Sequence, residues 1–213
     1  MQNNSSIQQQ SQAPVAHHLE EILVVQRSHL FKKIPAWHGI SNQNTPEIMS
    51  IINQHVSFMP RAHAETNPEY KQIIPYLIFL VNEKIFVMQR KATASEQRLA
   101  NKISIGIGGH IRQDDIADHN ILQWANREFH EEVTYYGAQQ LEILGILNDD
   151  TNDVGKVHMG VVILVRADSE KIFIKDEHKS GILLTKKECL QNTAAMESWS
   201  QLCLQFLIDH KIF

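Results

Sequence analysis

Two adjacent apolar runs, rich in β-branched and aromatic residues, constrain the fold of this chain most. The runs are "QIIPYLIFLV" (72–81) and "KIFVMQR" (84–90), and only Asn82 and Glu83 separate them. Their length and composition predict a β-hairpin. Pro75 cannot donate a backbone hydrogen bond, so we expect the first strand to begin at a sheet edge or to carry a bulge there.

Other segments predict further strands and helices around the hairpin. Strands are expected at 20–26, 103–110, 141–147, 157–166 and 171–175. Helices are expected at 45–55, 120–134 and 196–210, the first with Thr45 as its N-cap and Pro46 at its first position. In the sequence, predicted strands come before and after a central helix, and another helix follows at the end. This order predicts an α/β fold. In such a fold a mixed sheet carries helices on its two faces.

The composition changes along the chain and divides it into three parts. Residues 1–17 form a polar, glutamine-rich tail, which we expect to be disordered because it has little apolar surface to bury. Residues 18–66 are predicted to be an N-terminal extension packed on the core, and residues 67–213 to be the main domain. The extension could serve a dimer interface, so a homodimer is left open.

Net charge and cysteine usage narrow the class of partner and the compartment. A formal net charge of -4 argues against a nucleic-acid backbone as the main partner. Cys189 and Cys203 form neither a CxxC motif nor a disulfide framework, which fits a reducing compartment. The first 26 residues contain no Lys or Arg. The longest apolar run, 73–81, is far shorter than the roughly 20 residues that span a bilayer. We therefore expect a cytoplasmic protein that binds neither nucleic acid nor membrane.

The stretch "NREFHEEVTYYG" (126–137) gathers three glutamates on the predicted helix 120–134. Glu128, Glu131 and Glu132 are spaced i, i+3 and i, i+4, so their carboxylates can converge on one point. They adjoin an apolar stripe formed by Leu122, Ala125, Phe129 and Val133. Carboxylates this close repel one another unless a cation lies between them. The spacing alone leaves two interpretations open, a solvated acidic surface and a divalent-cation site.

Gly109 and the helical segment "REFHEEVTY" (127–135) resemble the box that defines the Nudix hydrolases. The matching helical positions are Arg127, Glu128, Phe129, Glu131, Glu132 and Tyr135. From about residue 20 onward, the chain is also similar to a subgroup of MutT-type phosphoesterases. The resemblance implies a Nudix-type α/β/α sandwich with a mixed central β-sheet, together with the N-terminal extension.

Three features depart from the family pattern. Arg127 follows Gly109 by 18 positions, which makes the loop between them longer than in the pattern. The glutamate that the pattern places in this loop has no clear counterpart. The substitutes at hand are Asp114, Asp115, Asp118 and His119. Thr134 stands where the pattern has a glycine that ends the helix.

The resemblance implies a Mg²⁺-dependent hydrolase, with Mn²⁺ as an alternative ion. Its substrate would be a nucleoside diphosphate linked to another moiety, or another small diphosphate, and water would attack phosphorus to cleave the phosphoanhydride bond. Glu128, Glu131 and Glu132 would be the metal ligands, helped by a backbone carbonyl of Gly108 or Gly109.

The resemblance also implies the catalytic roles. Arg127 would orient a carboxylate through a bidentate pair. The general base would be a glutamate of the box, Glu131 or Glu132, or one from a later loop, Glu177.

Five residues are predicted to contact the substrate. They are His110, Arg61, Arg90, Asp150 and His158. The two arginines could pair with phosphates. His110 could face the phosphates or make a structural hydrogen bond. Asp150 and His158 belong to "NDDTNDVGKVH" (148–158), which could line a pocket, bind a second metal or form a plain acidic turn.

Two other functional classes remain open at this point. The longer loop and the missing loop glutamate also fit a Nudix-fold nucleotide-binding or regulatory module without turnover. A third interpretation is isomerase or other non-hydrolytic chemistry on a diphosphate.

Overall fold

The computed structural model describes residues 20–90, 102–113, 120–175 and 178–213, so the predicted tail 1–17 lies outside the described residues. Its helices are α1 (Arg27–Leu30), α2 (Thr45–Gln54), α3 (Arg61–Ala64), α4 (Ile121–Glu132), α5 (Asp153–Val157), α6 (Lys186–Gln191) and α7 (Ser198–Asp209), with a 3-10 turn at Thr193–Ala195. Its strands are β1 (Glu21–Gln26), β2 (Gly39–Ser41), β3 (Ser57–Pro60), β4 (Tyr70–Val81), β5 (Lys84–Arg90), β6 (Ile103–Ser104), β7 (Gly106–Gly108), β8 (Val133–Tyr135), β9 (Gln139–Asn148), β10 (His158–Ala167), β11 (Ile172–Ile174) and β12 (His178–Thr185). Among the described segments, no helix has the length and apolar character needed to cross a bilayer.

Within the described residues, ten strands form one mixed sheet, whose main path is β12-β5-β4-β10-β9-β2. At its centre β4 and β10 pair in parallel, from His158 opposite Gln72 to Arg166 opposite Leu80. The other neighbours along the path are antiparallel. Because β10 occupies one edge of β4 along most of its length, β1, β7 and β5 share the other edge. Strands β8 and β11 form a separate two-stranded sheet.

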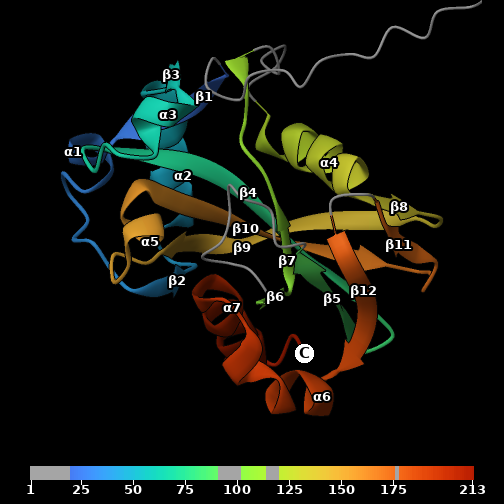
Figure 1. The fold of residues 1–213 in the computed structure, drawn as a ribbon. Helices are drawn as coiled ribbons and strands as arrows, with labels where there is room; N and C mark the ends of the chain where they lie inside the picture. Colours follow the sequence, from blue (N-terminus) through green and yellow to red (C-terminus); the bar gives the residue numbers. More distant parts are fainter. Residues whose placement is uncertain (1–19, 91–101, 114–119, 176–177) are drawn as a thin grey trace, which may run out of the picture.

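Side chains alternate along the central strands and fill two apolar cores, one on each face of the sheet. Along β4, Ile73, Leu77 and Phe79 lie in the first core, and Ile74 and Ile78 lie in the second. Helix α4 covers the first core, and α7 covers the second with α6 beside it (Figure 1). The predicted α/β/α sandwich with a mixed central sheet is confirmed.

The predicted hairpin is present, but Pro75 has a different place in it. Asn82 and Glu83 both have positive φ, 46° and 58°, which identifies a type I′ turn between β4 and β5. Pro75 lies in the interior of a central strand, opposite Val161, at neither an edge nor a shift of register. The expectation of an edge or bulge is therefore wrong. On the other edge of β4, Pro75 falls between the residues that pair with β1 and with β7, so none of the described strands needs a backbone N–H donor at this position.

Strands from the first sixty residues enter the same sheet. β1 pairs with β3 and with the start of β4, and β2 pairs with β9 at the end of the path. Helices α1, α2 and α3 gather at the end of the sheet where β1 and β3 lie (Figure 1). This arrangement brings Glu65, the C-cap of α3, close to His158, the first residue of β10.

Several element boundaries differ from the predicted ones. The helix expected at 120–134 ends at Glu132, because Val133 begins β8 and pairs with Ile174 of β11. Asn44 is the N-cap of α2, and Thr45 is its first residue instead of its cap. β12 and α6 correspond to no predicted element.

Candidate metal centre and active site

Helix α4 carries the three glutamates, and its apolar face fixes its orientation on the sheet. Asn120 caps the helix, with its Oδ1 accepting from the N–H of Leu122 at 3.0 Å. Phe129 is fully buried and its ring stacks on that of Phe79, with centroids 6.0 Å apart. Burial of this face turns the adjoining side of the helix, which bears the glutamates, toward Gly109.

Glu128 is the buried member of the glutamate cluster. It is 5% exposed, and a Cβ added at Gly109 would stand 2.4 Å from its Cδ. No methyl group fits there, so the carboxylate can occupy this position only beside a glycine. Burial raises the pKa of Glu128 from 4.5 to about 7. Arg127 opposes this rise, and the charges of Glu131 and Glu132 add to it.

Arg127 binds two of the carboxylates. Its Nη2 donates to Oε1 of Glu128 at 3.1 Å, and its Nη1 donates to Oε1 of Glu131 at 2.5 Å. Arg112 donates to the other oxygen of Glu131 at 3.2 Å. Glu131 is exposed and Glu132 is half-buried. The structure thus brings the predicted glutamates and Arg127 together, with one buried carboxylate and two that solvent can reach.

His110 faces away from the glutamates, although it directly follows Gly109. Its Nε2 donates to Oε1 of the fully buried Gln72 at 2.8 Å and lies 3.9 Å from Oε1 of Glu65. The ring of His158, the first residue of β10, is centred 5.8 Å from that of His110. Burial lowers the pKa of His158. Two of the predicted substrate contacts therefore lie side by side.

Arg61 lies beside the same group. Its Nη1 is 3.6 Å from Glu20, and its Nε is 3.6 Å from Glu65. Glu20 also pairs with Arg112 at 2.9 Å. Ion pairs therefore run without interruption from Glu65, through Arg61, Glu20 and Arg112, to Glu131 of the glutamate cluster.

Asp150 lies in a partly buried ion-pair network. Its carboxylate accepts from both Nη atoms of Arg27 at 2.9 and 2.5 Å, and from Nζ of Lys71 at 2.7 Å. Burial alone would raise the pKa of Asp150, but the hydrogen bonds from Arg27 and Lys71 hold it well below its usual range. A substrate contact by Asp150 stays a prediction.

The remaining candidates lie outside the described part of the chain. Glu177 and the four substitutes for the loop glutamate belong to the undescribed segments, and the side chain of Arg90 is not described either. The sequence did not single out Glu65, Arg112 or Gln72. The i, i+4 spacing of Arg61 and Glu65 is the signal that could have drawn attention to Glu65.

Comparisons with known proteins assign the family. No protein-family model matches the chain. The chain is 32% identical over 200 residues to Protein YmaB of Bacillus subtilis (strain 168), covering 88% of this chain and 97% of YmaB. It matches the crystal structure of Tm1382, described as a candidate Nudix hydrolase, at 29% identity and a TM-score of 0.77. That match covers 91% of this chain and 100% of Tm1382. The chain belongs to the Nudix superfamily.

A more distant Nudix-type structure shares only the fold. The MutT protein of Methanosarcina mazei Go1 has a TM-score of 0.50 at 13% identity, over 66% of this chain and 95% of that one. The longer match to Tm1382 supports a Nudix hydrolase with, in general terms, a pyrophosphohydrolase reaction. The roles of the individual Nudix residues in this chain remain predictions.

Proposed function

We propose that this chain is a Mg²⁺-dependent Nudix hydrolase that cleaves the phosphoanhydride bond of a nucleoside diphosphate linked to another moiety. One observation carries the proposal: Glu128, Glu131 and Glu132 share one side of α4, and Glu128 is pressed against a glycine that leaves room for nothing larger. An apolar helix face would be the usual neighbour of a sheet, so a buried carboxylate there suggests a ligand.

The residues present fit a small divalent cation. Glu128, Glu131 and Glu132 offer only oxygen donors, which Mg²⁺ prefers, and a backbone carbonyl of Gly108 or Gly109 would add another. Mn²⁺ suits the same donors. When bound, the ion would supply positive charge that neutralises the phosphoryl oxygens of the substrate.

The protein's own groups would orient the carboxylates and accept a proton. Arg127 holds Glu128 and Glu131 in fixed positions through its two donated bonds, a task that suits its planar fork. Water attacks phosphorus, the bond to the leaving phosphate breaks, and the proton of the water passes to a general base. Glu131 and Glu132 are reachable by solvent and are the candidates within the box. Glu177 is the candidate outside it.

Substrate contacts complete the proposal. Arg61, Arg90, His110, Asp150 and His158 stay the predicted contacts to a small nucleotide or other diphosphate. Cys189 and Cys203 are both free and buried, which supports a reducing, cytoplasmic location.

The test is an assay of the purified chain with Mg²⁺ against nucleoside triphosphates, dinucleotides and nucleotide sugars. We expect metal-dependent release of phosphate or a monophosphate. Glu131→Gln and Glu132→Gln should each lower the rate, by roughly 10²–10⁴ for the one that acts as general base. Glu142→Gln is the matched control, because that exposed glutamate pairs with Arg166 away from α4.

Calorimetry with the same compounds measures binding, so together with the assay it distinguishes a hydrolase from a nucleotide-binding module without turnover. Binding without product in the wild-type chain, or wild-type rates in both box variants, would contradict the proposal.

A further inference from the structure

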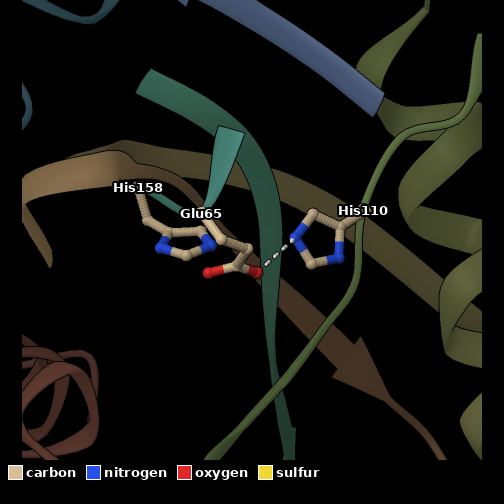
Figure 2. A group of neighbouring side chains, drawn as sticks. All are labelled: Glu65, His110 and His158. Atoms are coloured by element: carbon tan, nitrogen blue, oxygen red, sulfur yellow. Dashed lines mark ion pairs between the residues drawn. The ribbon is translucent and has the colours of Figure 1, made fainter. Parts of the chain in front are cut away.

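Three side chains from separate elements meet next to the glutamate cluster but do not belong to it. Glu65 follows α3, His110 follows β7, and His158 begins β10. One ligand atom from each lies within 4.8 Å of the other two. Figure 2 shows the Glu65 carboxylate between the two imidazole rings, with both rings turned toward it.

His158 already has the tautomer and the support of a metal ligand. Its Nδ1 lies 2.7 Å from the carbonyl oxygen of Val154, which can only accept, so the ring proton is on Nδ1. Nε2 therefore keeps its lone pair. His158 is 8% exposed, and its ring packs edge-on against that of Trp199, with centroids 6.4 Å apart. A histidine that donates its other nitrogen to a backbone carbonyl is the usual arrangement of a metal-binding imidazole.

His110 is held by the side-chain amide of Gln72, whose NH₂ group is an unsatisfied donor. Nε2 of His110 donates to Oε1 of Gln72 at 2.8 Å. Gln72 is fully buried, yet its Nε2 has no hydrogen-bond partner among the residues that the structure describes. A buried amide donor without an acceptor costs about 1–3 kcal/mol. An oxygen atom brought by a ligand, such as a water on a bound ion, would accept from it.

We propose that Glu65, His110 and His158 bind a divalent first-row transition ion, for which Zn²⁺ is the best match. Two imidazoles and one carboxylate are a donor set of zinc enzymes that keep a coordination position open. Mg²⁺ prefers oxygen ligands, so this site and the carboxylates of α4 would select different ions.

The side chains of Glu65, His110 and His158 would have to move only slightly closer together to bind the ion. Zn²⁺ binds imidazole nitrogen and carboxylate oxygen at about 2.0–2.2 Å, which places the donors of a tetrahedral site roughly 3.4 Å apart. In the structure, Nε2 of His110 is 3.9 Å from Oε1 of Glu65. The Glu65 side chain is 34% exposed, so it has room to move toward the rings. His110 would shift its ring proton from Nε2 to Nδ1 and release Gln72.

The two candidate sites lie on different sides of the segment that contains Gly109 and His110. Gly109 abuts Glu128, whereas its neighbour His110 faces Glu65 and Gln72. Arg61, 3.6 Å from Glu65, competes with an ion for that carboxylate. It can keep its pair with Glu20 when Glu65 turns to the metal. With this ion bound, the contacts that His110 and His158 are predicted to make with a substrate would run through the open coordination position of the ion.

The experiment is a titration of the metal-stripped, full-length chain with Co²⁺, in excess Mg²⁺ that fills the carboxylate site. We expect one equivalent of Co²⁺ to give visible ligand-field absorption of a four- or five-coordinate ion, and Zn²⁺ to abolish it by displacement. Glu65→Gln, His110→Gln and His158→Gln should each weaken Co²⁺ binding at least tenfold. His130→Gln, at an exposed histidine of α4, and Glu131→Gln are the matched controls and should bind as the wild type does.

A measurement on the wild-type chain covers the case in which a variant fails to fold. Zn²⁺ should move the side-chain ¹⁵N resonances of two histidines, His110 and His158, and leave the others unchanged. The proposal is overturned by wild-type protein that takes up no stoichiometric Co²⁺ or Zn²⁺. It is also overturned by shifts confined to other histidines, or by Glu131→Gln removing the site. All these readouts are independent of turnover, so failure of the hydrolase proposal would leave them interpretable.

Discussion

At the scale of single residues, Gly109 is the position on which the glutamate site depends most. We predict that Gly109→Ala raises the Mg²⁺ concentration needed for half-maximal binding by about tenfold or more, since added volume in a packed site costs about 1–3 kcal/mol. The added methyl group would displace the carboxylate of Glu128. Calorimetric titration with Mg²⁺ measures the effect.

Gly137→Ala is the matched control for this substitution. The three atoms nearest to its Cβ would belong to the side chains of Tyr135 and Asp168, and none of them belongs to the glutamate cluster. If both variants bind Mg²⁺ as the wild type does, Gly109 does not shape the site.

The raised pKa of Glu128 makes a second prediction at this scale. The folded, metal-free chain holds this proton up to a pKa of about 7, and the unfolded chain releases it near 4.5. The folded state therefore binds more protons between these values, so the free energy of unfolding should fall as the pH rises through this window. The total loss is up to about 3 kcal/mol, because each tenfold change in proton affinity is worth about 1.4 kcal/mol.

Urea unfolding of the metal-free chain between pH 5 and 8 measures this loss. Glu128→Gln should flatten the profile, and Glu142→Gln should leave it as it is. A wild-type stability that rises over this range would contradict the environment described for Glu128.

The sequence predicts some of these residues and not others, for physical reasons. The i, i+3 and i, i+4 spacing of the glutamates indicates proximity because a helix fixes it locally. Glu65 meets His110 and His158 only after β4 and β10 have paired, and nothing local signals that. In the sequence, Gln72 is only the polar residue that begins an apolar run. Its burial depends on the pairing of β4 with both β1 and β10.

At the scale of elements, the turn between β4 and β5 makes a third prediction. Glu83 has a φ of 58°, a conformation that a side chain disfavours by about 1 kcal/mol or more. Glycine is the preferred residue after asparagine in a type I′ turn. We expect Glu83→Gly to stabilise the chain by roughly 0.5–1 kcal/mol in urea unfolding. Glu83→Ala is the control, and an equal gain from alanine would mean that backbone strain is not the cause.

Elements with strong local patterns were predicted, and elements defined by pairing were not. The apolar periodicity of α4 and α7 and the composition of β4, β5 and β10 are local signals. β8 exists because residues 133–135 pair with β11, which cuts short a helix that the local pattern would continue. β12 was missed because its segment, "HKSGILLT", begins polar and contains a glycine.

At the scale of the whole molecule, Asp150 ties together three distant parts of the chain. It accepts hydrogen bonds from Arg27, after β1, and from Lys71, in β4. We predict that Asp150→Asn lowers the free energy of unfolding at pH 7 by about 3 kcal/mol, because it leaves the fully buried Lys71 ammonium without its carboxylate. Asp153→Asn removes an exposed pair with Lys156 and should change stability by less than about 0.5 kcal/mol.

The pH dependence gives this prediction a second readout. The pKa of Asp150 is depressed in the folded chain, so its contribution is present above the ordinary pKa of an aspartate and is lost as the pH falls. Wild type and Asp150→Asn should therefore converge in stability toward acid pH. If the difference in free energy of unfolding between them does not change with pH, the charge of Asp150 is not its cause.

The parallel pairing of β4 with β10 is the feature of the whole fold that the sequence could not supply. Two apolar strands so far apart in the chain carry no local signal of their partner or register. The composition of the elements nevertheless predicted a mixed sheet with helices on both faces, and the family resemblance agreed with it. What positions Glu65, His110 and His158 is this central pairing, so their meeting had to come from the structure.

Hydrolysis in ¹⁸O-labelled water, followed by ³¹P NMR, shows most directly whether this chain transfers a phosphoryl group to water. With Mg²⁺ and a cleaved member of the nucleotide panel, we expect one ¹⁸O atom in a phosphate product. We also expect strong loss of this product in Glu131→Gln, Glu132→Gln or both, and an unchanged rate in Glu142→Gln. Product without label on phosphorus, or labelled product formed equally fast when both box glutamates are replaced, would contradict the proposed function.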